Sequence, residues 1–339
     1  MENGGALGAL RALGVAGMLE KRRVGKLGAA SLVVSLPADW VRLTGIRKGD
    51  DVFVYKQGLS LLVTPSEKKR RGRVAEVTLV DAPGAMIEFF SRYIQGFDSI
   101  RVINKAPQSE MQALLEAVDS HLLGVQVLEQ SKEATTFYVF TREHASLPQL
   151  FKRLRFVVQS ISKIIVQELR SPKFDSTQVK ILAKSAFKLY FLVMRLIYGA
   201  ARGSRDLAEA RLSFGELLSF ALAAKNICGI LDSVTRLVRA CEDLNAPFAQ
   251  DKTLVDSIER AAGLYERCFT AFIRKEKIDF GAVRRERREL IVAVNCLPQQ
   301  KGMFEEEARV ARDTQLLVYE FADKAGELME LAANIEGFE

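Results

Sequence analysis

The chain has 339 residues, of which 48% are hydrophobic and 27% are charged, and its net charge is +7. At about 100 to 200 residues per domain, this length predicts two or three domains, each with enough apolar residues for a core. The best candidate for a membrane span, residues 189–201, carries Arg195 in its middle, whereas a span needs ~18 consecutive apolar residues. We therefore expect a globular protein with no membrane insertion.

The positive charge is concentrated near the N-terminus. Residues 1–75 contain 14 Lys and Arg against 6 Asp and Glu, a net charge of +8, so the rest of the chain sums to −1. A local excess of this kind suits a polyanionic partner, and a solvated charged surface is the alternative that charge alone leaves open.

The first 17 residues are rich in glycine and lack the basic start of a secretion signal, so we expect residues 1–17 to form a disordered extension, with Met1 and Met18 both open as the native start. The cysteines have no CxxC spacing and fall in helical patterns, which predicts reduced core residues in a cytoplasmic protein. They are Cys228, Cys241, Cys268 and Cys296.

Residues 18–65 follow the order strand, short helix, hairpin. The stretch "SLVVSL" is β-branched and apolar, Pro37 can open the helical turn "PADWVRLTG", and Gly45 can close it. The runs "DVFVY" and "LSLLVT" flank "KQG", which is typical of a hairpin. So few residues cannot bury much apolar surface alone, and we infer that two copies interleave around one core.

A charged linker without apolar residues is expected at 66–73, and a small α/β domain at 74–145. In that domain two strand–helix units precede two further strands, "VQVLEQ" and "TTFYVF". Each predicted helix is followed by a glycine, Gly96 or Gly124, where the chain must turn back.

From 147 to 339 the pattern is entirely helical. Six helices in two sets of three are expected, which indicates an internal duplication. Their predicted ranges are 148–170, 176–199, 206–244, 251–276, 279–296 and 302–335.

The third and the sixth of these helices carry apolar stripes at helical spacing, so we expect each stripe to lie in a core or an interface. The stripe of the third is Leu217, Ala221, Ala224, Cys228, Leu231, Thr235 and Val238, and that of the sixth is Leu317, Phe321, Ala325, Leu328 and Ala332.

Nothing in the sequence indicates an enzyme. The glycine-rich start lacks the strand and the Lys-Ser/Thr ending of a phosphate-binding loop, and the chain has neither an H-E-x-x-H nor an E-x-x-H motif. A Ser or Cys nucleophile needs a nearby general base, and the only histidines are His121 and His144, so no such base is evident.

The basic residues before and around the first strand are the candidate DNA-binding residues, together with one on the short helix. In a two-fold pair they would offer about ten cations to phosphates. They are Lys21, Arg22, Arg23, Lys26 and Arg42.

Residues 26–65, with the spacing "SLP..WV....I.KGD", resemble the swapped-hairpin DNA-binding domains of the AbrB/MazE/SpoVT type. The resemblance implies an interleaved dimeric β-barrel that reads DNA with basic residues of the first strand region and the short helix. Carried over to this chain, those residues are Arg22, Arg23, Lys26 and Arg42.

The rest of the chain resembles archaeal-type phosphate uptake regulators with a C-terminal PhoU-like helical domain. "DAPGAMIEFFSRYIQGFDSIRV", "LAAKNICGILDSVTRLV" and "LLVYEFADKAGELMELA" carry the likeness. In the usual Glu-x-x-x-Asp metal motifs, Cys228 and Tyr319 stand at the Glu positions and leave Asp232 and Asp323. One Asp per motif is too few for a hard cation, so we expect no metal cofactor.

Three functions are compatible with these features of the sequence. The first is a cytoplasmic, homodimeric DNA-binding transcription regulator linked to phosphate uptake or homeostasis, whose helical domain contacts a phosphate transporter subunit or a sensor protein. The second is an adaptor that regulates such a partner by protein–protein contact, with an N-terminal domain that mainly dimerises. The third, an antitoxin, is weaker because antitoxin tails are short, whereas this one exceeds 250 patterned residues.

Overall fold

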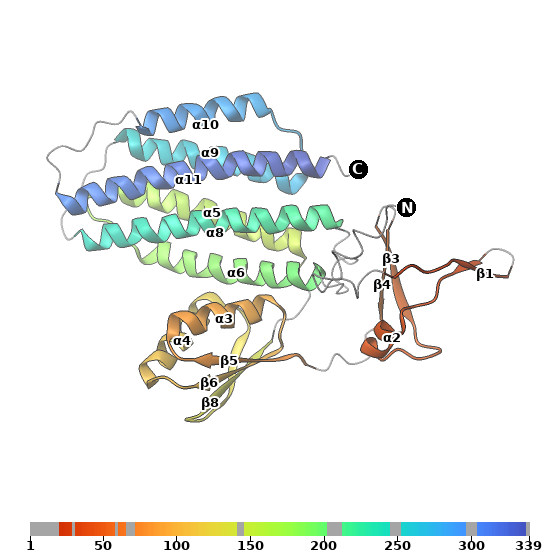
Figure 1. The fold of residues 1–339 in the computed structure, drawn as a ribbon. Coiled ribbons are helices and arrows are strands. Elements are labelled where there is room, and N and C mark those ends of the chain that lie inside the picture. The colour runs from red at the N-terminus through yellow and green to blue at the C-terminus, as the bar shows by residue number, and fades with distance from the viewer. Residues whose placement is uncertain are drawn as a thin grey trace, which may run out of the picture. The chain divides into compact units, whose positions relative to one another are not determined.

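The computed structural model describes residues 20–28, 31–57, 60–65, 72–140, 146–201, 212–244, 252–295 and 304–336 (Figure 1). The chain divides into two compact units, Met1–Lys69 and Arg70–Glu339. It is a mixed α+β protein with a helical C-terminal region, as the sequence predicts at this coarse level. The expectations for residues 1–17, for most of the 66–73 linker, and for His144 and Cys296 fall outside the described residues.

The described part of the N-terminal unit consists of two separate antiparallel hairpins and a short helix. The predicted order of strand, helix and hairpin is confirmed, with one difference: the first strand is itself half of a hairpin. The elements are β1 (Gly25–Leu27), β2 (Ser31–Val33), α2 (Ala38–Thr44), β3 (Val52–Gln57) and β4 (Ser60–Pro65).

Proline and glycine set the ends of α2 as predicted. Pro37 is the N-cap residue. Gly45 closes the helix at φ 69°, a left-handed conformation that glycine adopts without the strain a Cβ would add, and its N–H donates to the carbonyl oxygen of Val41 at 2.9 Å.

The second unit begins with an α/β part in which every predicted strand and helix is present. Its four-stranded sheet has the order β5-β6-β8-β7, with β5 and β6 parallel and the other pairs antiparallel. The elements are β5 (Val74–Leu79), α3 (Ala82–Ile94), β6 (Ser99–Asn104), α4 (Gln108–His121), β7 (Val125–Gln130) and β8 (Ala134–Val139).

Helices α3 and α4 cover one face of this sheet and lie between it and α6 (Figure 1). Strand β5 alternates exposed and buried residues, as a strand with one covered face must. Under the helices, the rings of Phe89 and Phe137 meet edge to face with their centroids 4.8 Å apart. The parallel β5–α3–β6 unit therefore has its own small core.

In the described part of residues 146–336, six long helices share one hydrophobic core. Where the two sets of three meet, the first helix of one set lies beside the first of the other (α5 and α9), and the third beside the third (α8 and α11). The helices are α5 (Leu147–Leu169), α6 (Thr177–Ala201), α8 (Phe214–Asp243), α9 (Lys252–Arg274), α10 (Phe280–Asn295) and α11 (Glu305–Glu336).

The apolar stripe predicted on α11 is confirmed, because all five of its residues are buried. The stripe predicted on α8 is only part of what is buried there: Ala221, Cys228 and Thr235 are half-buried, whereas Phe220 and Ile227 are buried in addition. Helix α8 packs against both α6 and α11, so a single seam understates its buried face.

Among the described residues, α8 is the one helix long and apolar enough to cross a membrane by length and composition. In its most apolar window 61% is buried inside the protein. This burial is what the core helix of a multi-helix protein shows, so α8 is weak evidence for a membrane span.

A buried arginine joins the α/β part to the helical part. Nη1 of Arg195, on α6, donates to the carbonyl oxygens of Tyr93 at 2.6 Å and Phe97 at 3.0 Å, next to the end of α3. Its Nη2 lies 3.9 Å from Oδ1 of Asp98, and its guanidinium lies 5.1 Å from the centroid of the Tyr93 ring. Burial raises the pKa of Tyr93 to about 12, against the opposing effect of the nearby Arg195 charge.

Candidate nucleic-acid interface

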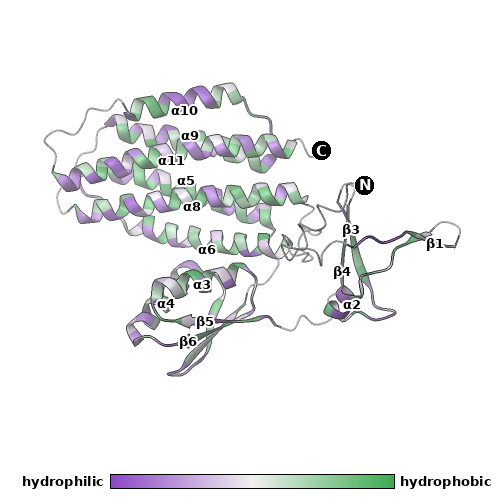
Figure 2. Ribbon diagram, viewed as in Figure 1, coloured by the Kyte–Doolittle hydropathy of each residue, from purple (hydrophilic) through white to green (hydrophobic). Residues whose placement is uncertain are grey.

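The described part of the N-terminal unit has no core of its own. None of its residues falls in the buried class, and α2 buries no residue. Isolated two-stranded hairpins are at best marginally stable in water. Hydrophobic residues nevertheless recur along β3 and β4 (Figure 2), and the unit exposes ten large apolar side chains: Val24, Leu27, Leu32, Val33, Val34, Leu36, Leu43, Phe53, Val54 and Leu61.

All five predicted DNA-binding cations are open to solvent. Three precede β1, Lys26 lies on β1, and Arg42 lies in the last turn of α2. The Arg22 guanidinium pairs with the carboxylate of Glu20. Because this pair is exposed, it contributes little and leaves Arg22 able to exchange its partner for a phosphate.

The register of β1 and β2 places Lys26 and Leu32 on one face of the hairpin and two other apolar residues on the opposite face. Lys26 lies opposite Leu32, and Gly25 lies opposite Val33. Successive side chains of a strand point to opposite faces, so Leu27 and Val33 share the face away from Lys26. The hairpin can therefore bury Leu27 and Val33 against a partner while it presents Lys26 to an anion.

The weak metal candidates on the helical part do not form a metal site. Asp232 is exposed, and the carboxylate of Asp323 is held by the Arg287 guanidinium and lies 3.6 Å from Nζ of Lys324. Among the described residues, no group of three His, Cys, Asp or Glu side chains gathers where a metal ion could bind. The carboxylate of Asp323 is thus already paired with two cations.

Burial accounts for the chemistry of the described cysteines. It raises the pKa of Cys241 and of Cys268 to about 12. It also raises the pKa of Cys228, with a further contribution from the carboxylate of Asp232. The raised pKa values make these thiols poor nucleophiles at neutral pH. Of the predicted core cysteines, Cys268 is buried, whereas Cys228 and Cys241 are half-buried.

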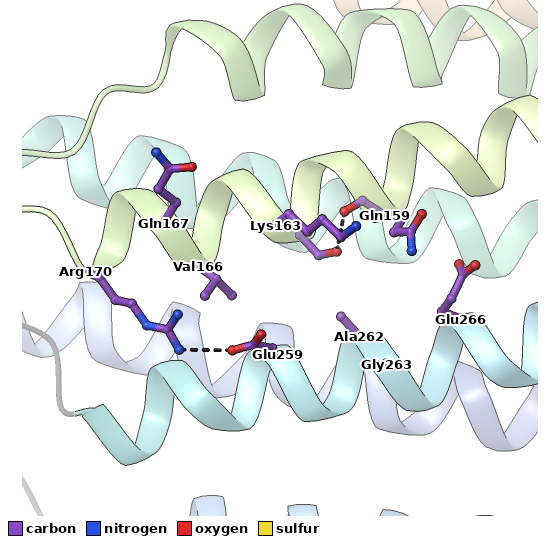
Figure 3. Close-up of a pocket in the computed structure, with 10 residues that line it drawn as sticks. Gln159, Lys163, Val166, Gln167, Arg170, Glu259, Ala262, Gly263 and Glu266 are labelled. Atoms are coloured by element: carbon purple, nitrogen blue, oxygen red, sulfur yellow. Dashed lines mark hydrogen bonds and ion pairs between the residues drawn. The ribbon is translucent and has the colours of Figure 1, made fainter.

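A groove between α5 and α9 is a second place where polar side chains gather (Figure 3). It has a volume of about 450 Å³, and Ala262 and Gly263 leave room in its floor. Its charges are largely paired: Nη2 of Arg170 lies 3.0 Å from a carboxylate oxygen of Glu259, and Nη1 of Arg155 lies 2.7 Å from Oε1 of Glu266. Internal pairing leaves little net charge to select one class of ligand.

Sequence reasoning placed the basic residues but missed two features. It used Arg195 only as evidence against a membrane span, although an arginine within an apolar helix also signals a buried carbonyl or carboxylate partner. It also gave no sign of a cavity between α5 and α6 that is lined by Lys152, Arg153 and Lys188 among others, because residues from three segments line that cavity.

The chain matches no protein-family model, no curated protein and no solved structure.

Proposed function

We propose that this protein is a homodimeric DNA-binding transcription regulator of the cytoplasm, linked to phosphate uptake or homeostasis. One observation carries the proposal: the N-terminal unit has no buried residue among those described, yet it exposes both apolar side chains and a row of cations. Two copies that interleave their hairpins would cover the apolar faces and bring both sets of cations to one surface.

On that dimer, the Lys and Arg side chains contact phosphate oxygens and release counter-ions from the duplex. These contacts give affinity that falls with salt and is largely independent of sequence. Base reading then falls to arginines presented from the strand region or from α2, as in proteins that read DNA with a β-ribbon.

The link to phosphate rests on the resemblance of the helical part to PhoU-like domains. The six described helices support this link. The first helices of the two sets, α5 and α9, pack together, and so do the third helices, α8 and α11, as expected for a duplicated three-helix bundle. In the proposed mechanism, a transporter subunit or a sensor binds the helical part and favours one of two dimer arrangements on DNA. Such a partner must bind the two arrangements with unequal affinity.

A salt series tests DNA binding. Fluorescence anisotropy of a labelled duplex would measure the affinity of the full chain and of Arg22→Ala/Arg23→Ala. We expect a log–log slope that corresponds to several phosphate contacts, reduced by about 2 to 4 in a dimeric double variant. Lys252→Ala/Lys277→Ala, which removes exposed cations of the second unit, is the matched control.

A second candidate function, that of an adaptor, is favoured by an exposed apolar stripe on α8. Phe214, Leu218 and Leu222 recur at intervals of four and are all exposed, so they form one ridge on the helix. A full chain that shows no shift of duplex at low salt, and that binds a transporter subunit through this ridge, would replace the regulator by the adaptor.

A further inference from the structure

An open cavity of about 540 Å³ lies between α5 and α6. It is also lined by Leu123, which follows Leu122, the C-cap residue of α4. Its size is within the range of about 300 to 1,000 Å³ that is usual for small-molecule sites. The described residues that line it are Leu123, Lys152, Arg153, Phe156, Val157, Ser185, Lys188 and Leu189.

The charge of this cavity is positive and uncompensated. Lys152 and Arg153 come from α5, and Lys188 comes from α6. None of the three makes an ion pair within the described chain, and no acidic residue is among the described lining. Lys188 is half-buried. Lys152 and Arg153 are exposed. Three cations that line one cavity, with no acidic residue among its described lining, attract a ligand with more than one negative charge.

Exposed apolar side chains also line this cavity. The Phe156 side chain is 65% exposed and Leu123 is 44% exposed, while Val157 and Leu189 are half-buried beside them. An aromatic ring next to cations is the combination on which nucleic-acid bases stack, because the ring covers the base while the cations hold the phosphate.

We propose that this cavity binds a small nucleoside phosphate, with the base against Phe156 and the phosphates held by Lys152, Arg153 and Lys188. The hydroxyl of Ser185 is placed to donate to a phosphate or ribose oxygen. Inorganic phosphate would leave the apolar half uncovered, and a fatty acid carries a single charge for three cations. Leu123 belongs to the α/β part and the other residues to the helical part, so the ligand contacts both. The site goes beyond the proposed DNA binding and does not depend on it.

The test is isothermal titration calorimetry on the full chain with the Arg22→Ala/Arg23→Ala changes, which remove cations of the N-terminal unit that would also attract anions. The probes are ATP, AMP, adenosine, pyrophosphate and a short single-stranded oligonucleotide. We expect ATP to bind more tightly than both pyrophosphate and adenosine. Lys188→Gln and Phe156→Ala should each weaken ATP binding about tenfold.

Two control variants match these changes. Lys184→Gln removes an exposed, unpaired lysine of α6 that does not line the cavity, and Phe214→Ala removes a phenylalanine of similar exposure (60%) on α8. Both should leave ATP affinity unchanged. The proposal is overturned if ATP gives no heat at millimolar concentration, if pyrophosphate binds as tightly as ATP, if the oligonucleotide binds more tightly, or if Lys188→Gln and Phe156→Ala bind like the controls.

Discussion

Replacement of Arg195 by methionine should loosen the joint between the α/β part and the helical part. Methionine keeps much of the apolar stem but removes the donors to the carbonyl oxygens of Tyr93 and Phe97. Hydrogen bonds from charged groups contribute ~1.5 to 3 kcal/mol each, and the change leaves carbonyl oxygens without their donor. With Arg195 only 8% exposed, we expect the free energy of unfolding of the second unit to fall by about 3 kcal/mol.

Differential scanning calorimetry measures this loss. An unfolding entropy of ~2.1 cal/mol/K per residue converts 3 kcal/mol into a fall in Tm of about 5 °C for the second unit. Hydrogen exchange should also accelerate around residues 93–98, because α3 loses its tie to α6. Arg101→Met is the control, since its pair with Glu76 is exposed and contributes less than ~1 kcal/mol. A Tm for Arg195→Met equal to that of the control would refute the role given to Arg195.

Three further predictions test other parts of the fold. Burial alone would raise the pKa of Glu216, but its ion pair with Lys275 and the N–H of Ser213 hold that pKa below the ordinary 4.5. Glu216→Gln should therefore lower the free energy of unfolding by about 1 kcal/mol at pH 7. Urea titrations should show this difference fading as the pH falls below 4.5, because the wild-type carboxylate then takes up its proton. The thiols of the half-buried Cys241 and the buried Cys268, with pKa values of about 12, should resist iodoacetamide at pH 7.5 in the folded chain and react in urea, and rapid labelling of the folded chain would contradict these raised pKa values. Phe321→Ala removes a buried ring of α11 that lies 5.7 Å from Tyr265, so chemical denaturation should reveal a loss of ~3 to 5 kcal/mol, against little change for the exposed Phe304→Ala.

Local patterns were enough to predict most elements of this chain. Gly96 and Gly124 adopt φ 79° and 74°, which only glycine does without strain, so the turns after α3 and α4 were readable from residue type. The helical spacing of apolar residues likewise predicted the buried stripe of α11, because that stripe lies in the shared core.

Long-range packing was not readable in the same way. The stripe predicted on α8 covers only part of the buried face of that helix, because both α6 and α11 pack against it. The local pattern of apolar residues does not tell how many helices will pack around one helix. The partner of Arg195 lies about 100 residues away in the α/β part, and the three cations of the α5–α6 cavity line one site only once both helices are packed.

The candidate interface was predictable in its charges but not in its faces. Clustered Lys and Arg are visible in any sequence, but which apolar residues lie opposite them depends on register. Only the pairing of Lys26 with Leu32 shows that Leu27 and Val33 lie on the other side of the hairpin. That register also identifies the residues to change.

The measurement that bears most directly on the proposed dimer is sedimentation velocity of the full chain carrying Leu27→Glu/Val33→Glu, run beside a duplex-binding titration. If two copies bury these side chains in one core, the charges should convert the dimer to monomer and abolish duplex affinity together, while Val127→Glu/Leu128→Glu on β7, which also charges exposed apolar residues, should change neither. A Leu27→Glu/Val33→Glu chain that stays dimeric and binds duplex like the wild type would contradict the shared N-terminal core.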